Sequence, residues 1–416
     1  MWQLTKFTEQ RLALPVLGSC SSTRRIRAWL PRVLMVAVTV LAAACGSRVA
    51  SPQSRGTESA GSRAQATASA ALTAAQLVQG ATGWALTAEN LSLTSDAGQT
   101  WTTITPPGAS AGTIKGVFFT DPQDGWVVSY QPPSTSNATQ LQISATSDGG
   151  KSWSSSPLGK PDPAFTDSQS LPAYVDFLDA MHGWVVVMLA SSANFSTGIL
   201  FQTSDGGATW SRLSLPVGGP VEFISPTTGW LADGRQGDQL YVTSDGGQAW
   251  TAETVAPPAG FTQEQAAYTI PRFTSPADVI LAAFSNGTGS AAGFYQANAG
   301  ATSWQLKATV PAGSPSGDVS PAASLVSPTQ WVAITPDGTQ IVDVTQNGGS
   351  QASISPAGLP SPANTAVSQA SFSSTASGWL VADTSQCAGF KTNCTERTAL
   401  FATTDNGAHW TQLAVP

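Results

Sequence analysis

The sequence is poor in charge, in histidine and in cysteine. Only 10% of its 416 residues are charged, against about 25% in an average soluble domain. Two histidines and four cysteines leave little material for a metal site, which needs Cys, His or carboxylate ligands in clusters. We therefore predict no metal site, and nothing in the sequence implies a cofactor.

Basic residues are especially scarce after the first 66 positions. From residue 67 onward there are 23 acidic and nine basic residues, a net charge of −14, and the nine bases are scattered. A nucleic-acid partner is excluded because phosphate binding needs clustered Lys and Arg. The 41% of hydrophobic residues is enough to bury a large core, so the bulk of the chain is predicted to fold.

The N-terminal segment has the pattern of an export signal. Four arginines between Arg24 and Arg32 precede an apolar run over 33–44, which is too short to span a bilayer comfortably. The run ends in Leu-Ala-Ala-Ala-Cys45-Gly, which resembles the lipobox of bacterial lipoproteins, in which the Cys accepts the lipid. We predict a signal peptide over 1–44 and lipidation at Cys45. The alternatives are lipidation at Cys20, a plain secretory signal, or an uncleaved anchor.

Residues 45–72 are rich in Ser, Ala and Thr and contain no aromatic residue. They are predicted to form a flexible tether, with a root-mean-square reach of roughly 25–30 Å. The protein is therefore expected at the extracytoplasmic face of the cell membrane. Cysteine usage agrees with export, because Cys387 and Cys394 flank a short loop that a disulfide could close.

Internal repeats are the strongest signal in the sequence. The motif Thr-Ser-Asp-Gly-Gly-x-x-Trp occurs in five clear copies and two degenerate ones. A second motif precedes each copy: an apolar anchor residue, usually Phe, then about five residues, then Gly-Trp. The anchors of the seven units are Leu77, Phe119, Phe177, Phe223, Phe273, Leu325 (by approximate alignment) and Phe372.

Each unit reads as four short strands, and Asp followed by Gly-Gly is typical of a tight turn. Seven units of about 50 residues predict an all-β fold over 73–416, a seven-bladed β-propeller of four-stranded antiparallel blades. Two modes of ring closure stay open. The repeats coincide with the blades, or a strand near residues 67–75 completes the last blade.

The conserved-looking aspartates of the repeats are predicted to be structural. They would lie on turns between outer strands, where a carboxylate accepts turn N–H groups; calcium binding is the alternative. They are Asp96, Asp148, Asp205, Asp245 and Asp405. His182 and His409 stand beside motif residues and are interpreted as turn or rim residues.

The Ser/Thr-x-Asp-x-Gly-x-x-Trp motif resembles the Asp-box, or bacterial neuraminidase repeat. Combined with the Phe-x5-Gly-Trp motif, it is most similar to the photosystem II assembly and stability factor family. That resemblance implies a propeller that acts without enzymatic activity, as an assembly factor for a membrane-protein client. Sialidase chemistry would need three convergent arginines, and this chain has few in its repeats.

One polar cluster is predicted from the repeats. The residue just before the anchor is Asp176, Glu222 and Arg272 in three consecutive units. Because inner strands line the centre of a propeller, these side chains should be neighbours there. The interpretations are an interblade salt bridge, a polar mouth that binds a ligand or peptide terminus, or a general acid/base pair.

The sequence thus predicts a non-enzymatic, lipid-anchored scaffold that binds or assembles an envelope or membrane protein. The alternative is a glycan-binding protein or a sialidase-like glycoside hydrolase of the Asp-box type. The longer inserts between strands are a second candidate surface, since variable loops on a repeated scaffold commonly bind partners.

Overall fold

A computed structural model describes residues 71–131, 139–160, 162, 165, 172–192, 195–232, 240–274, 277–285, 290–298, 303–311, 322–327, 330–334, 341–345, 351–354, 357–360, 365–374, 376–387 and 394–416. All of these residues belong to one compact unit, Gln65–Pro416. The predicted signal peptide and Cys45 lie outside the described residues.

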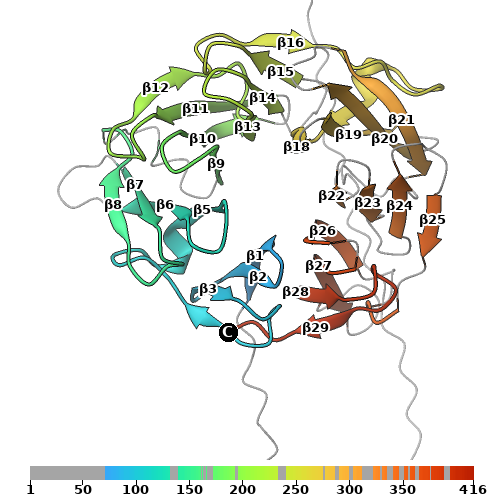
Figure 1. The fold of residues 1–416 in the computed structure, drawn as a ribbon, viewed down its shortest axis with the longest axis horizontal. Helices are drawn as coiled ribbons and strands as arrows, with labels where there is room; N and C mark the ends of the chain where they lie inside the picture. Colours follow the sequence, from blue (N-terminus) through green and yellow to red (C-terminus); the bar gives the residue numbers. More distant parts are fainter. Residues whose placement is uncertain are drawn as a thin grey trace, which may run out of the picture. The chain divides into compact units, whose positions relative to one another are not determined.

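The described strands form seven antiparallel sheets, numbered here in chain order (Figure 1). Sheet 1 contains β1 (Leu72–Gln79), β2 (Thr82–Thr87), β3 (Leu91–Thr94) and β4 (Thr102–Thr103). Sheet 2 follows the short helix η1 (Ala111–Thr113) and contains β5 (Ile114–Phe119), β6 (Gly125–Gln131), β7 (Gln140–Thr146) and β8 (Ser154–Pro157). Sheet 3 contains β9 (Ala173–Phe177), β10 (Gly183–Ser192), β11 (Phe195–Thr203) and β12 (Ser211–Ser214). Sheet 4 contains β13 (Val221–Phe223), β14 (Gly229–Ala232), β15 (Leu240–Thr243) and β16 (Thr251–Glu253).

Sheet 5 follows helix η3 (Gln263–Gln265) and has five strands. They are β17 (Ala266–Tyr268), β18 (Arg272–Thr274), β19 (Ala277–Ser285), β20 (Ser290–Asn298) and β21 (Gln305–Pro311). Sheet 6 contains β22 (Ala322–Ser327), β23 (Gln330–Ile334), β24 (Ile341–Thr345) and β25 (Gln351–Ile354). Sheet 7 contains β26 (Thr365–Phe372), β27 (Gly378–Cys387), β28 (Cys394–Thr403) and β29 (Thr411–Leu413). The predicted all-β propeller of four-stranded antiparallel sheets is confirmed, with β17 and β18 sharing the inner position in sheet 5.

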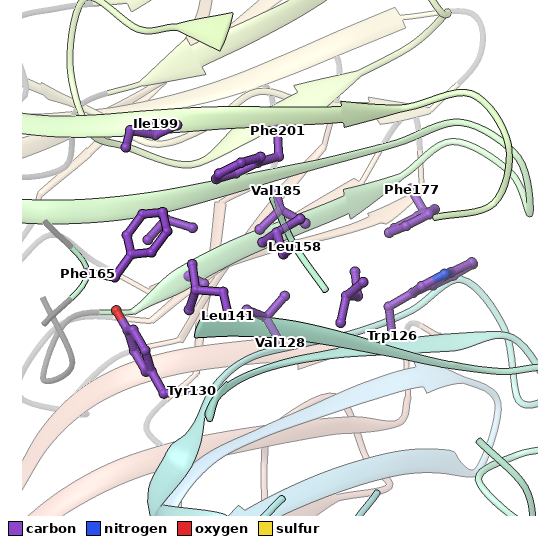
Figure 2. Close-up of a cluster of buried hydrophobic side chains, with 13 residues drawn as sticks. Trp126, Val128, Tyr130, Leu141, Leu158, Phe165, Phe177, Val185, Ile199 and Phe201 are labelled. Atoms are coloured by element: carbon purple, nitrogen blue, oxygen red, sulfur yellow. The ribbon is translucent and has the colours of Figure 1, made fainter. Parts of the chain in front are cut away.

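The core lies between the sheets rather than within one of them. Each of seven buried apolar clusters joins two consecutive sheets, including the last and the first. Figure 2 shows the cluster between sheets 2 and 3, with Trp126 and Phe177 at one end and Tyr130 and Phe165 at the other. Because both faces of a sheet are covered by its neighbours, apolar residues dominate the strands and few charges are needed.

The aromatic residues of the two motifs pack against one another between neighbouring sheets. Trp126 of sheet 2 stacks on Phe177 of sheet 3, with ring centroids 3.8 Å apart and planes at 8°. The same Phe177 ring meets Trp210 of its own sheet edge-on, at 6.2 Å and 84°. The two Trp columns of the repeat therefore converge on one anchor ring. This geometry combines stacked and edge-on contacts, the two arrangements that aromatic pairs prefer.

The same aromatic packing requires glycine at the first position of the Gly-Trp motif. A Cβ built on Gly183 would lie 2.3 Å from the ring of Phe177, and one on Gly229 would lie 2.5 Å from Phe223. The anchor ring lies flat over the glycine backbone, which no larger residue would allow. The anchor and the glycine are paired residues on the first and second strands of a sheet. The spacing Phe-x5-Gly-Trp therefore reflects the length of the turn between these two strands.

The ring closes by packing between complete sheets. Strand β1 pairs with β2 in sheet 1, and sheet 7 is built from C-terminal strands alone. Among the described residues, no N-terminal strand completes the last sheet, so the repeats coincide with the blades. Three hydrogen bonds between described residues cross the seam. Trp101 Nε1 donates to the Ala414 carbonyl at 3.0 Å, Leu77 N donates to Ser371 Oγ at 3.0 Å, and Ser373 Oγ donates to the Gly80 carbonyl at 2.8 Å.

Candidate functional site

The predicted polar cluster lies on the innermost strands, around the centre of the ring (Figure 1). Asp176 is on β9, Glu222 on β13 and Arg272 on β18, each one residue before an anchor. Side chains alternate across a strand, so the residue before a buried anchor occupies the other face. The structure brings all three into one group that spans sheets 3 to 5.

The cluster is held by one ion pair and one buried hydrogen bond. Arg272 Nη1 contacts Glu222 Oε2 at 2.7 Å, with the arginine side chain 57% exposed and the glutamate side chain 19% exposed. Asp176 is buried, and its Oδ2 accepts a hydrogen bond from Phe223 N at 2.8 Å. Every one of these contacts joins one sheet to the next.

Burial raises the pKa of the Asp176 carboxyl well above its ordinary value, and the nearby Glu222 charge raises it further. The hydrogen bond from Phe223 N and the Arg272 charge act in the opposite direction. A carboxyl of this kind is a candidate proton donor. However, its oxygen is already engaged by backbone, and Glu222 is already paired with Arg272.

Two other residues that directly precede an anchor show what a side chain at this position contacts. Ser324 Oγ accepts from Phe372 N at 2.9 Å, and Ser371 Oγ accepts from Leu77 N at 3.0 Å. As with Asp176, the side chain before one anchor accepts a hydrogen bond from the backbone N–H of the next anchor. Sequence reasoning gave these serines no role, although their position in the column was the available signal. The column is an interblade hydrogen-bond row, and the arrangement favours the salt-bridge interpretation of the charged triad.

Each Asp-box aspartate lies in the turn between the third and fourth strands of its sheet. In the first box, Asp96 Oδ1 accepts from Thr94 Oγ1 at 2.7 Å and from Thr100 N at 2.8 Å, and Oδ2 accepts from Thr100 Oγ1 at 2.6 Å. These hydrogen bonds, led by that from the Thr100 hydroxyl, lower the pKa of Asp96 to about 2. Bonds of the same kind lower the pKa values of Asp148 and Asp205 to about 2.

In two Asp boxes the fourth residue after the aspartate has no hydroxyl group. His409 occupies this position in the last box, and its Nδ1 lies 2.6 Å from Asp405 Oδ2. Ala249 occupies it in the fourth box and offers only its backbone N–H to Asp245, at 2.9 Å. The carboxylates close their own turns, and among the described residues no three Asp, Glu, His or Cys side chains are placed to hold a metal ion.

A second row of interblade contacts involves the third residue after each box Trp. Ser156 Oγ donates to the Gly207 carbonyl of the next box at 2.7 Å. Glu253 occupies the same position and is buried; its Oε2 accepts from Trp230 Nε1 at 2.9 Å and from Trp304 Nε1 at 3.1 Å. Desolvation raises the pKa of this carboxyl. The sequence analysis missed Glu253. It could have been found as an acidic residue at a repeat position that is Ile104 or Leu413 in other units.

A pocket of about 290 Å³ opens between sheets 2 and 3, at their outer strands. Phe165 and Phe201 line it, and both side chains are almost fully buried. At its edge Arg212 Nη1 pairs with Asp162 Oδ2 at 2.8 Å. Arg212 lies on the outer strand β12.

The remaining predicted residues are distributed as follows. His182 contacts Asp179 in the turn before β10, with Nδ1 to Oδ2 at 3.0 Å. Cys387 and Cys394 are the last cross-strand pair of the β27–β28 ladder, so the backbone places them opposite each other. Within the described part of the chain, no helix has the length and apolar character to cross a bilayer.

Comparison with known proteins points to one family. Residues 93–268 match the family model described as Photosynthesis system II assembly factor YCF48. The photosystem II assembly lipoprotein Ycf48 of Synechococcus sp. (strain CC9902) is 29% identical over 143 residues, which cover 33% of this chain and 35% of that protein. The chain therefore matches about a third of the length of this curated relative.

The chain also resembles solved structures, including the following two. YCF48 from Cyanidioschyzon merolae has 17% identity and a TM-score of 0.46, covering 76% of this chain and 89% of that one. The GH74 enzyme of Niastella koreensis has 10% identity and a TM-score of 0.51, covering 83% of this chain and 66% of that one. At these identities both likenesses concern the fold alone.

Proposed function

The protein is a BNR-type β-propeller similar to photosystem II assembly factors, and from this premise we propose that it is a non-enzymatic scaffold that binds a membrane-protein client. The observation that carries the proposal is the match of residues 93–268 to an assembly-factor family. The geometry of the ring supports it, because the carboxylates of the repeats are engaged in turns and interblade contacts. Asp176, Glu222 and Glu253 each make a contact to the next sheet.

The client would be a protein of the cell envelope with a membrane-embedded part. The relatives are named for assembly of photosystem II, and what carries over is the type of activity, assembly of a membrane complex. The photosystem itself is not carried over, because the match to the curated relative covers only 35% of that protein.

The proposed mechanism is confinement at the membrane combined with a rigid binding surface. Cys45 would carry the lipid, and residues 45–72 would tether the propeller at the extracytoplasmic face. A tether of this length has a root-mean-square reach of roughly 25–30 Å, so the ring would remain close to the bilayer surface. The curated relative is also named as a lipoprotein, which supports this arrangement.

The test is cross-linked co-purification from native membranes. The wild-type chain is compared with Cys45→Ala, and Cys20→Ala is the matched control because it removes the rival lipidation site. We expect one abundant membrane protein to co-purify with the wild type and with Cys20→Ala, and to be lost with Cys45→Ala. No partner above background in any of the three samples would overturn the scaffold proposal. Loss with Cys20→Ala instead would move the lipid to Cys20.

Glycan binding or glycoside hydrolysis is the competing outcome. The likeness to a GH74 enzyme concerns the fold alone. A glycan array and a fluorogenic glycoside screen on the purified chain address it directly. A specific signal that Glu222→Gln abolishes would replace the scaffold proposal with a glycan-directed function.

A further inference from the structure

The short turn between β9 and β10 carries most of the large apolar side chains that are exposed. Among the residues that the structure describes there are three: Leu178 at 36%, Met181 at 50% and Leu306 at 41%. Two of the three lie in this turn, and Ala180 between them is exposed as well. Single exposed apolar residues are ordinary on a protein surface, whereas a group of them in one place points to a contact site. We name residues 178–182 the apolar turn.

The backbone of this turn is closed by its second residue. Asp179 Oδ1 accepts from the N–H groups two and three residues later, each at 2.7 Å. In sheet 2, Asp121 Oδ1 accepts from the equivalent N–H groups at 2.7 and 2.9 Å. In sheets 4 and 7 the hydroxyls of Ser225 and Ser374 take the place of the carboxylate. The turn is thus built in the same way in four sheets, and no exposed apolar side chain is needed to close it.

Sheet 2 has polar side chains at both of the positions that are apolar in sheet 3. Leu178 corresponds to Thr120, because the N–H of each donates to the carbonyl four residues later, at 3.0 and 3.1 Å. Met181 corresponds to Gln123, because the carbonyl of each accepts from a glycine N–H of the Asp box at 3.0 Å. The fold therefore accepts polar side chains here, and the exposure of Leu178 and Met181 is not a requirement of the turn.

The apolar turn lies among carboxylates. It shares an edge of sheet 3 with the Asp-box turn, since Gly183 pairs with Thr203, and a Cβ built on Gly206 would lie 4.0 Å from Met181 Sδ. The turns at this edge of sheets 2 and 3 contain five aspartates, one lysine and one histidine. They are Asp121, Asp124, Asp148, Asp179, Asp205, Lys151 and His182. The surroundings of the exposed apolar side chains are therefore negatively charged.

Three of these aspartates are held firmly in the charged form. Hydrogen bonds, led by one from a hydroxyl four residues later, lower the pKa values of Asp148 and Asp205 to about 2. Hydrogen bonds from His182 lower the pKa of Asp179, whose side chain is 49% exposed. Fixed charge of one sign attracts a partner of the opposite sign and suppresses partners of the same sign.

We propose that the apolar turn is a docking site for a segment of the client protein that presents an apolar side chain flanked by lysine or arginine. The inference rests on the proposed function and deepens it by giving the chemistry of the partner. The apolar side chain of the client packs against Leu178 and Met181, and its cations face the aspartates of sheets 2 and 3. An anionic bilayer is the less favourable occupant, because these carboxylates repel its headgroups.

Substitutions taken from other sheets of the same ring separate the apolar contribution from the electrostatic one. Leu178→Thr combined with Met181→Gln installs the residues of sheet 2, and Asp179→Ser installs the turn-closing serine of sheets 4 and 7. Leu306→Thr is the matched control, because it removes the third exposed apolar side chain, on β21. Each variant is compared with wild type, as the full lipidated chain, by cross-linked co-purification of the client from native membranes.

We expect the double variant to lower the yield of client by roughly tenfold and Asp179→Ser to lower it by roughly twofold. Leu306→Thr should leave it unchanged. Added salt should weaken capture by the wild type, because the exposed charges are screened. Unchanged capture by the double variant, or an equal loss with Leu306→Thr, would overturn the inference and leave the scaffold function intact.

Site-specific photo-cross-linking then identifies the docked segment. A benzoylphenylalanine is introduced at Ala180, in the apolar turn, and at Gln248, an exposed residue in the Asp-box turn of sheet 4. We expect a client adduct several-fold stronger from position 180, and a cross-linked client peptide that has lysine or arginine beside an apolar residue. A peptide without such a cation would overturn the inference, and adducts with lipid alone would replace the protein segment with a membrane contact. Absence of any client with the wild type would contradict the scaffold function, and the docking site with it.

Discussion

Phe223 and Trp184 stack across neighbouring sheets, with ring centroids 3.7 Å apart and planes at 3°. Phe223 comes from sheet 4 and Trp184 from sheet 3, and the Trp184 side chain is completely buried. The pair repeats the relation between Phe177 and Trp126 one sheet earlier. The contact between sheets is thus built from the two residues that make the sequence motif recognisable.

Replacing this anchor with a smaller apolar residue should weaken the ring. For Phe223→Leu we expect a loss of about 1–2 kcal/mol in the free energy of unfolding, because the stacked and edge-on contacts are removed and a small cavity is left. Urea denaturation followed by tryptophan fluorescence measures it. Leu306→Ala is the control, since Leu306 is exposed and should change stability by less than about 0.5 kcal/mol. Equal urea midpoints for Phe223→Leu and wild type would contradict a stabilising role of these ring contacts.

The motif glycine should tolerate no side chain. For Gly229→Ala we expect a loss of about 1–3 kcal/mol, because the new Cβ would meet the Phe223 ring at 2.5 Å. Gly112→Ala is the matched control: its Cβ would have no neighbour within 4 Å. The same denaturation experiment compares the two. If Gly112→Ala were the more damaging change, close packing on the motif glycine would not be the reason for its presence.

The fourth Asp box can be completed. Ala249→Thr supplies the hydroxyl that Thr100 and Thr209 donate to Asp96 and Asp205 in other boxes. We expect a rise in melting temperature on the order of 1 °C, and a pKa of Asp245 closer to that of Asp205. NMR titration of the carboxyl resonances tests the pKa. Ala249→Val, which has the same shape without the hydroxyl, should give neither effect.

Asp176 should make stability depend on pH in a defined direction. Its pKa is raised in the folded protein, so its contribution is present in full below the unfolded pKa near 3.9 and is lost as pH rises through the folded value. An Asn side chain would retain an acceptor for Phe223 N without titrating. We therefore expect Asp176→Asn to gain stability over wild type as the pH increases from 4 to 8.

Asp205→Asn is the control of opposite sign. Hydrogen bonds lower the pKa of Asp205 to about 2, so the stability that it contributes is present above the unfolded pKa and is lost as pH falls through the folded value. This variant should be less stable than wild type at pH 7, with the difference shrinking below pH 4. Denaturation midpoints across the pH range decide both cases. A difference between Asp176→Asn and wild type that does not change with pH would contradict the prediction.

The cysteine pair should form a disulfide when the protein folds under oxidising conditions. Cys387 and Cys394 are directly opposite in an antiparallel ladder, and the Cα separations of such pairs, about 4.5–5.5 Å, fall within the range of disulfides. Non-reducing peptide mapping by mass spectrometry should recover the two peptides linked. Recovery of both as free thiols from oxidised, exported protein would exclude the bond.

The spacing of the motifs was enough to predict the fold class and the four-strand unit. This was possible because Trp, Gly and Asp each satisfy a local requirement: a ring to be buried, a backbone to be covered, and turn N–H groups to be bonded. The column of Asp176, Glu222 and Arg272 followed from their shared position before the anchor in three consecutive units. These features depend on neighbours within a repeat or at the same position of the next repeat.

Only the tertiary structure decided how the ring closes, what the serines of the inner column accept, and that Glu253 accepts from one indole of its own sheet and one of the next sheet. Such features join residues as distant as Trp101 and Ala414, and no local propensity encodes a contact over that separation. A repeat determines its own unit, whereas closure of the ring and the contacts between sheets arise when all units pack together.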